Sequence, residues 1–163
     1  MMEKATYPVA GTTDTRAEHG VWRRAVVVRR HLDAGEKSIW AETAAEGSVM
    51  LVLCSGSVTC LNALAPEPRS DPAFVIRGGG SILLRAESDA TVVSVRVPVT
   101  APPGEADPVA VVDDPELSAA AFAFASALLD APRPDGGGDA VVERMLSEVA
   151  LQLRGISRPE NLG

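Results

Sequence analysis

Histidine, aromatic residues and long apolar runs are all scarce in this chain. It has two histidines, and aromatic residues make up only 4% of its 163 residues. Because the hydrophobic fraction is still 46%, the core has to be built from Val, Leu, Ala and Ile. The longest apolar runs, residues 49–54 and 91–95, are far shorter than the ~20 residues that a membrane span needs. We therefore expect no membrane segment.

An excess of basic residues is also missing. The formal net charge is −7, which argues against nucleic-acid binding because that function needs a basic face. Two arginine pairs, Arg23-Arg24 and Arg29-Arg30, flank an apolar segment, and we expect them to be the solvated ends of a strand. The N-terminus is polar and has no signal peptide pattern, so we expect a cytoplasmic protein.

Cysteine is nearly absent as well. In a cytoplasmic protein the two thiols, Cys54 and Cys60, are expected to be reduced. Both lie in apolar strand contexts, and buried free cysteines are common core residues. A redox-sensing pair is the alternative interpretation.

The chain length suits one compact domain whose first part is rich in strands. Short β-branched and apolar segments separated by turn residues predict strands over residues 23–31, 38–43, 49–54, 58–61, 74–76, 81–85, 91–97 and 109–112. The turn sequence Ser55-Gly56-Ser57 predicts that residues 49–54 and 58–61 form a hairpin. Three prolines predict that residues 65–72 are a loop, and Gly78-Gly79-Gly80 predicts a sharp turn.

The C-terminal part has the pattern of two helices after a linker rich in proline and glycine. Asp113 or Asp114 is expected to cap the first helix with Pro115 in its first turn, and Asp139 is expected to cap the second. Apolar residues at helical spacing lie at Leu117, Ala121, Phe124 and Leu128, and again at Val142, Leu146, Val149 and Leu153. Strands followed by a helical pair predict an α+β domain. The short strands separated by turns suggest a β-sandwich or a small β-barrel. The predicted organisation is an arm (1–20), this sandwich or barrel (21–112), a helical pair (113–155) and a tail (156–163).

Two short motifs carry a resemblance to a known family. The stretch from Gly35 to Gly56, which ends in "CSGSV", and the stretch "RGGGSILL" from Arg77 resemble the two motifs of cupins. The order of parts is similar to the sensor domain of AraC-type transcription regulators. This resemblance implies a small antiparallel barrel of the jelly-roll type followed by two antiparallel α-helices that mediate dimerisation.

The resemblance also allows the family's metal site to be tested. Its pattern of two histidines, a carboxylate and a third histidine falls on poor metal ligands, namely Ala41, Thr43, Val49, and Ile82 or Leu83. Glu42 and Glu46 are nearby, but a slip of one residue turns a strand side chain to the other face. The histidines present, His19 and His31, are far from the motif. We therefore expect no metal and no cofactor.

Candidate binding and interface residues follow from the expected barrel and helices. A small barrel holds one small ligand, and the residues expected near it are Trp22, Trp40, Ala41, Thr43, Val49, Leu51 and Ile82. The expected dimer seam consists of Phe124, Leu128, Val142, Leu146 and Val149. For both sets the alternative is ordinary core packing. One of Arg77 and Arg85 is a candidate partner for an anionic ligand, with a solvated strand edge as the alternative.

The function that these patterns favour is non-enzymatic. We predict an effector-sensing and dimerising domain of an AraC-type regulator, with a homodimer and an unknown small-molecule effector as partners. The sequence ends at Gly163 without a helix-turn-helix, so DNA contact is expected only through a domain outside this sequence. The alternatives are a metal-free cupin that binds a small molecule or a protein by itself, and a cupin enzyme such as an isomerase. The apolar inner strands offer no clear acid–base pair for an enzyme.

Overall fold

Two antiparallel β-sheets and two helices make up the fold. The computed structural model describes residues 17–34, 39–45, 47–98, 109–131, 138–155 and 157–159. The larger sheet has the strand order β1 (Glu18–Trp22), β2 (Ala25–Leu32), β9 (Ala90–Pro98), β4 (Ser48–Ser55), β7 (Ala73–Arg77), β10 (Val109–Val112) and β11 (Ser157–Pro159). The smaller sheet has the order β3 (Ile39–Thr43), β8 (Ser81–Ala86), β5 (Ser57–Cys60) and β6 (Pro68–Ser70).

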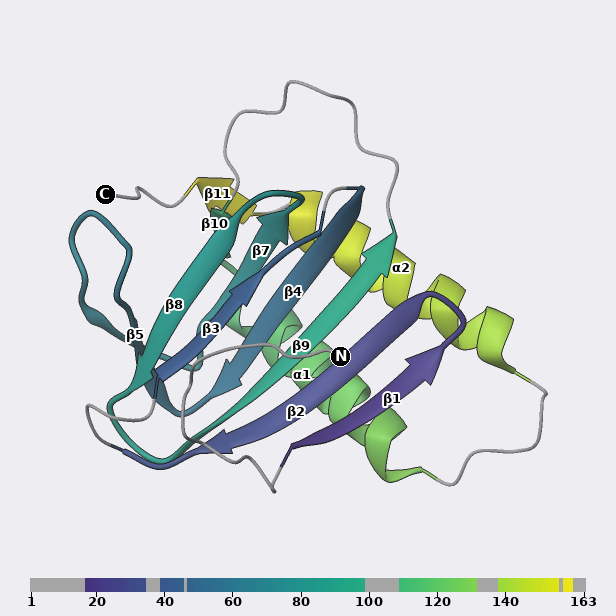
Figure 1. The fold of residues 1–163 in the computed structure, drawn as a ribbon, viewed down its shortest axis with the longest axis horizontal. Helices are drawn as coiled ribbons and strands as arrows, with labels where there is room; N and C mark the ends of the chain where they lie inside the picture. The colour runs from purple at the N-terminus through teal and green to yellow at the C-terminus, as the bar shows by residue number, and fades with distance from the viewer. Residues whose placement is uncertain are drawn as a thin grey trace.

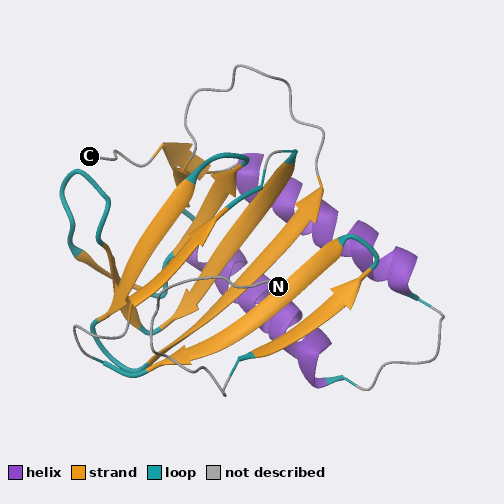
Figure 2. Ribbon diagram, viewed as in Figure 1, coloured by secondary structure: helices purple, strands orange, loops and turns teal. Residues whose placement is uncertain are grey.

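The helices form a third layer on the larger sheet. α1 (Pro115–Asp130) and α2 (Asp139–Gly155) run in opposite directions behind this sheet in Figure 1, while the smaller sheet lies in front of it. Figure 2 shows the same separation of helices and strands. The expected order of antiparallel strands followed by two antiparallel helices is therefore confirmed. The described strands pair as two separate sheets and not as one closed barrel.

Both faces of the larger sheet are buried, and each belongs to a different core. Along β4, Val49, Leu51 and Leu53 belong to the core beneath the helices. The alternate residues Met50, Val52 and Cys54 belong to the core between the two sheets. Successive strand side chains point to opposite faces, so a central strand covered on both sides is apolar throughout. This explains the continuous apolar run over residues 49–54.

The first helix begins where the sequence predicts. The Asp114 side chain accepts a hydrogen bond from the Leu117 amide at 3.0 Å, and Pro115 occupies the first turn. Both features stabilise a helix N-terminus, because they satisfy or remove amides that lack an intrahelical partner. On the buried side of α1 lie Ala121 and Ala125, whose small side chains allow the helix to approach the sheet closely.

Several expected boundaries differ from the structure. The predicted hairpin is wrong, because β4 pairs with β7 and β9 while β5 pairs with β6 and β8. The expected loop over residues 65–72 contains β6, an edge strand in which Pro68 is tolerated. β1 begins at Glu18, inside the expected arm, and β11 lies inside the expected tail. Short edge strands such as these are set by their partner strands and not by their own composition.

Other expectations fall outside the described residues. These are most of the arm, over residues 1–16, Glu46, and most of the linker rich in proline and glycine, over residues 99–108.

Gly56 joins the two sheets at a crowded turn, and replacing it with alanine is expected to be costly. Its φ is +115°, and an added Cβ would lie 2.8 Å from the Asp89 carbonyl oxygen and 2.9 Å from the Ala90 Cβ. Strain and overlap together predict a loss of at least about 3 kcal/mol in the free energy of unfolding. Gly47→Ala is the matched control, because Gly47 also has a positive φ but no atom within 4 Å of its added Cβ. We expect a loss of about 1–2 kcal/mol there, and equal losses in urea denaturation of the two variants would contradict the crowding at Gly56.

Candidate functional site

The seven residues expected around a ligand are divided among three surfaces. Trp22, Val49 and Leu51 lie in the core between the larger sheet and the helices. Trp40 and Ile82 lie in the core between the two sheets. Ala41 and Thr43 alternate with buried Trp40 on β3, so they point to the outer side of the smaller sheet, where Thr43 is exposed. The seven residues therefore do not line one common pocket.

The alternation of side chains along two strands separates these residues. On β3 the inward positions are Trp40 and Glu42, not Ala41 and Thr43, and on β4 the position facing the smaller sheet is Met50, not Val49. A displacement by one residue exchanges the two faces of a strand. No group of three or more His, Cys, Asp or Glu side chains among the described residues is placed to hold a metal ion.

The two cysteines are buried between the sheets and form no disulfide. Burial raises the pKa of the Cys54 thiol above its usual range, and the nearby Asp71 and Cys60 raise it further. The Cys60 thiol donates a hydrogen bond to the Asn62 side-chain oxygen over 3.2 Å. A thiol that is hard to ionise is a poor nucleophile, which favours the core role for Cys54.

The expected dimer residues pack on their own chain. Leu146 is 1% exposed, and Phe124, Leu128, Val142 and Val149 are partly buried against the same core. The large apolar side chains that α2 leaves exposed are Val141, Met145 and Leu151. A dimer formed through the helices therefore has to use the outer face of α2 together with the partly buried residues, and dimerisation itself stays a prediction.

A charged cluster lies at the margin between the two sheets. Glu42 on β3 faces inward, and its Oε2 accepts a hydrogen bond from Nη2 of Arg96 on β9 over 2.7 Å. Arg30 on β2 contributes a second positive charge that acts on the same carboxylate. Arg96 and buried Ser94 alternate with core residues of β9, so both face the smaller sheet.

The electrostatics of Glu42 reflect its partial burial. Burial raises the pKa of this carboxyl above 4.5, although the positive charges of Arg96 and Arg30 act in the opposite direction. A raised pKa means that the folded protein holds the proton more tightly than the unfolded chain does. The contribution of Glu42 to folding is therefore most favourable below pH 4.5 and becomes less favourable as the pH rises through its folded pKa.

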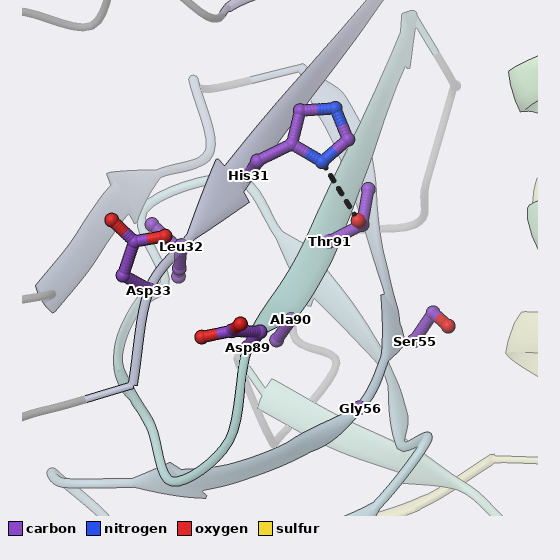
Figure 3. Close-up of a pocket in the computed structure, with 8 residues that line it drawn as sticks. All are labelled: His31, Leu32, Asp33, Ser55, Gly56, Asp89, Ala90 and Thr91. Carbon is purple, nitrogen blue, oxygen red and sulfur yellow. Dashed lines mark hydrogen bonds between the residues drawn. The ribbon is translucent and has the colours of Figure 1, made fainter.

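An open pocket of about 330 Å³ lies at the ends of β2 and β4 and at the start of β9 (Figure 3). His31 Nδ1 lies 2.9 Å from Thr91 Oγ1 at one side of it. The Asp89 carboxylate accepts a hydrogen bond from the Ala34 amide over 3.0 Å, so it holds the chain after β2. Leu32 joins the pocket to the core between the sheets, two residues beyond Arg30.

Arg29 connects the opposite face of β2 to its neighbours. Its guanidinium donates to both carboxylate oxygens of Glu18 on β1, each over 2.8 Å. It also donates to both carboxylate oxygens of Asp130 at the end of α1, over 2.7 and 3.2 Å. We call these three residues the Arg29 clamp. The side chain of Arg29 is only 12% exposed, so the expectation of a solvated strand end is wrong for this residue.

The clamp depends on ionised carboxylates. Hydrogen bonds from Arg29 lower the pKa of Glu18 and of Asp130 below their ordinary values of 4.5 and 3.8. A lowered pKa in the folded state gives stability above the unfolded pKa, and this stability is lost as the pH falls. The clamp is therefore fully formed near neutral pH and weakens in acid.

The pairing of Arg96 with Glu42 was not expected from the sequence, where Arg77 and Arg85 were the candidates for binding an anion. Arg85 instead pairs with Glu87 on its own sheet over 3.0 Å. The sequence does contain a sign of this pair, because Arg96 lies within a mostly apolar strand. A charged side chain on the inward face of a strand rarely lacks a partner.

Comparisons with known proteins give only distant likenesses. No family model matches the chain, and no curated protein matches it. A cupin-2 domain protein from Shewanella frigidimarina has 8% identity and a TM-score of 0.34, covering 45% of this chain and 70% of its own. The ectoine synthase from P. lautus has 17% identity and a TM-score of 0.40, covering 61% and 80%. The Cnp3 cupin domain from Schizosaccharomyces pombe has 8% identity and a TM-score of 0.40, covering 58% and 69%.

Two of these three proteins are thus named for a cupin domain, but the likenesses do not assign this chain to a family. Among the described helices, none is both long and apolar enough to cross a membrane.

Proposed function

We propose that this chain is a sensing and dimerising domain, of the kind that AraC-type regulators place before a DNA-binding domain. A small effector binds at the charged margin between the two sheets, and the helical pair carries the response. The order of strands and helices supports this proposal, since it is the order that the sequence resemblance implies. The proposed domain has no catalytic role, and it contacts DNA only through a domain outside this sequence.

The two faces of β2 carry the proposal. Arg30 faces the smaller sheet and acts on Glu42, whereas its neighbour Arg29 faces the helices and binds Asp130. One strand therefore contacts both the proposed effector site and α1. The turn after β1 adds a link to α2, because the Arg24 amide donates to Glu143 Oε2 over 2.9 Å. Coupling requires that the effector bind one arrangement of these elements better than another.

The test is the response of the dimer to a change at the proposed site. We expect the purified protein to sediment as a dimer, and Arg30→Gln to change the dimer dissociation constant by about fivefold or more. Arg85→Gln is the control, since Arg85 pairs with Glu87 on the smaller sheet and should leave the constant unchanged. A wild-type protein that stays monomeric at its highest soluble concentration would contradict the proposal. So would an unchanged constant in a folded Arg30→Gln protein.

A further inference from the structure

We propose that the outer face of α2 binds the same face of a second copy of this chain, with the two helices antiparallel across a two-fold axis. This inference rests on the proposed function, and it names the surface and the symmetry of the dimer. It follows from the apolar side chains that α2 leaves exposed, from the order of the charges between them, and from the small residues on the outer side of α1.

The exposed apolar side chains of α2 lie on the half of the helix that faces away from the sheet. Val141, Met145 and Leu151 are 60%, 44% and 51% exposed, whereas Leu146 and Leu153 belong to the core beneath the helices. At about 3.6 residues per turn, the first three side chains emerge on the side of α2 opposite to the last two. Apolar side chains that gather on one side of a helix, and that its own core does not use, indicate an interface.

Two charged residues lie between the apolar ones. Arg144 and Glu148 are exposed, and neither side chain has a hydrogen-bond or ion-pair partner among the residues that the structure describes. Residues three or four positions apart are neighbours on a helix surface, so Arg144 and Glu148 share one face with Val141 and Leu151. We call these four residues the α2 stripe.

The order of residues in the α2 stripe is self-complementary. From its N-terminal end the stripe is apolar, positive, negative and apolar. With a two-fold axis at the level of residue 146, Arg144 of each copy faces the partner's Glu148, and Val141 faces the partner's Leu151. A parallel copy in the same register would place Arg144 against Arg144 and Glu148 against Glu148, and such like-charge contacts are unfavourable. Since the surface carries its own complement, as a two-fold interface requires, its partner is a second copy.

The outer side of α1 extends this surface. A stable interface takes about 20–30 residues from each chain, which is more than the α2 stripe supplies. α1 lies beside α2 on the same sheet (Figure 2), and its exposed residues between Glu116 and Asp130 are all alanines, at positions 119, 120, 123 and 127. An outer side without charged residues is typical of a helix that another surface covers, so we expect α1 to join the contact next to the α2 stripe.

Charge reversal tests the surface. In analytical ultracentrifugation we expect Arg144→Glu to raise the dimer dissociation constant by about tenfold or more, because it turns two ion pairs into two like-charge contacts. Adding Glu148→Arg to this variant restores opposite charges, and we expect it to return the constant close to the wild-type value. Arg85→Glu is the control, because it makes the same change in net charge on the smaller sheet, and we expect it to leave the constant unchanged. Arg144 and Glu148 are exposed, so circular dichroism should show that these variants fold.

Cysteine cross-linking tests the direction of the two helices. We expect a mixture of Val141→Cys and Leu151→Cys proteins to form a disulfide-linked heterodimer under mild oxidation, because the two positions face each other. Neither variant is expected to cross-link with itself, since the two copies of residue 141 lie about 15 Å apart along the helix axis, beyond the reach of a disulfide. The wild type, whose two thiols are buried, is the control.

The outcomes separate this inference from the proposed function. If the wild type is a dimer but Arg144→Glu leaves its dissociation constant unchanged, or if Val141→Cys cross-links with itself, the antiparallel contact is wrong and the dimer uses another surface or direction. If the wild type is monomeric at its highest soluble concentration, the dimerising role fails together with this contact. If the expected pattern is found while Arg30→Gln leaves the dimer unchanged, the contact stands and the coupling to an effector fails.

Discussion

Replacing Leu146 with aspartate is expected to unfold the protein or to remove most of its stability. Leu146 is 1% exposed, in the core where α2 packs on the larger sheet. The substitution leaves a cavity and buries a carboxylate without a partner, which together cost about 4 kcal/mol or more. Since small domains are stable by about 5–15 kcal/mol, this loss should be plain in urea denaturation followed by circular dichroism.

Val141→Asp is the matched control on the same helix. Val141 is 60% exposed and lies in the first turn of α2, where a negative charge is favourable. We expect its free energy of unfolding to change by no more than about 0.5 kcal/mol. Equal free energies of unfolding for Leu146→Asp and Val141→Asp would contradict the burial of Leu146 between α2 and the larger sheet.

The pair also shows which residue can test dimerisation. Leu146 was expected in a dimer seam, but its burial in its own chain means that a change in sedimentation of Leu146→Asp would report unfolding. Val141 and Met145 are exposed at 60% and 44%, so aspartate there tests the outer face of α2 without disturbing the core. A weaker dimer in folded Val141→Asp would place the interface on this face.

Replacing Phe74 with alanine is expected to cost about 3–5 kcal/mol in the free energy of unfolding. Phe74 lies on β7 in the core between the two sheets and is 0% exposed. The same core contains the fully buried residues Met50, Ile76, Ile82 and Leu84. Because these residues lie on paired strands, they cannot move far to fill the cavity that the substitution leaves. Guanidinium denaturation measures the loss, with Leu64→Ala as control, because Leu64 is 65% exposed.

This prediction bears on where a ligand is able to bind. A large loss at Phe74 means that the middle of the space between the sheets is filled by side chains, so an effector has to bind at the margin near Glu42 and Arg96. A loss below about 1 kcal/mol would instead indicate loose packing around Phe74. A site deeper between the sheets would then replace the one at the margin.

Most elements of the fold were predictable because their signals are local. The eight predicted strands overlap with strands of the structure, and the cap at Asp114 lies where the sequence places it. The three missed strands, β1, β6 and β11, lie at edges of their sheets. An edge strand is stabilised largely by pairing with one neighbour, so its own residues need not be strongly apolar or β-branched.

The candidate site was not predictable to the same degree. Its members come from β2, β3 and β9, of which β9 is far from the other two in the sequence, and their approach depends on how two sheets stack. The motif count placed Ala41 and Thr43 at the site, whereas the structure turns Glu42 inward and binds it to Arg96. When positions are assigned by counting residues from a glycine, an error of one residue cannot be detected within the strand. Such an error assigns every side chain of that strand to the wrong face of the sheet.

The sequence by itself determined both helices and most of the strands, the aliphatic core and the order of strands before helices. These follow from periodicity, capping and turn chemistry, which act between residues close in the chain. Only the tertiary structure decided which face of each strand meets the helices and which meets the smaller sheet. Strands such as β4 are apolar on both faces because both faces are covered. The sequence of such a strand therefore does not reveal which of its side chains face the helices and which face the smaller sheet. The meeting of Arg30, Glu42 and Arg96 therefore became visible only with the layers in place.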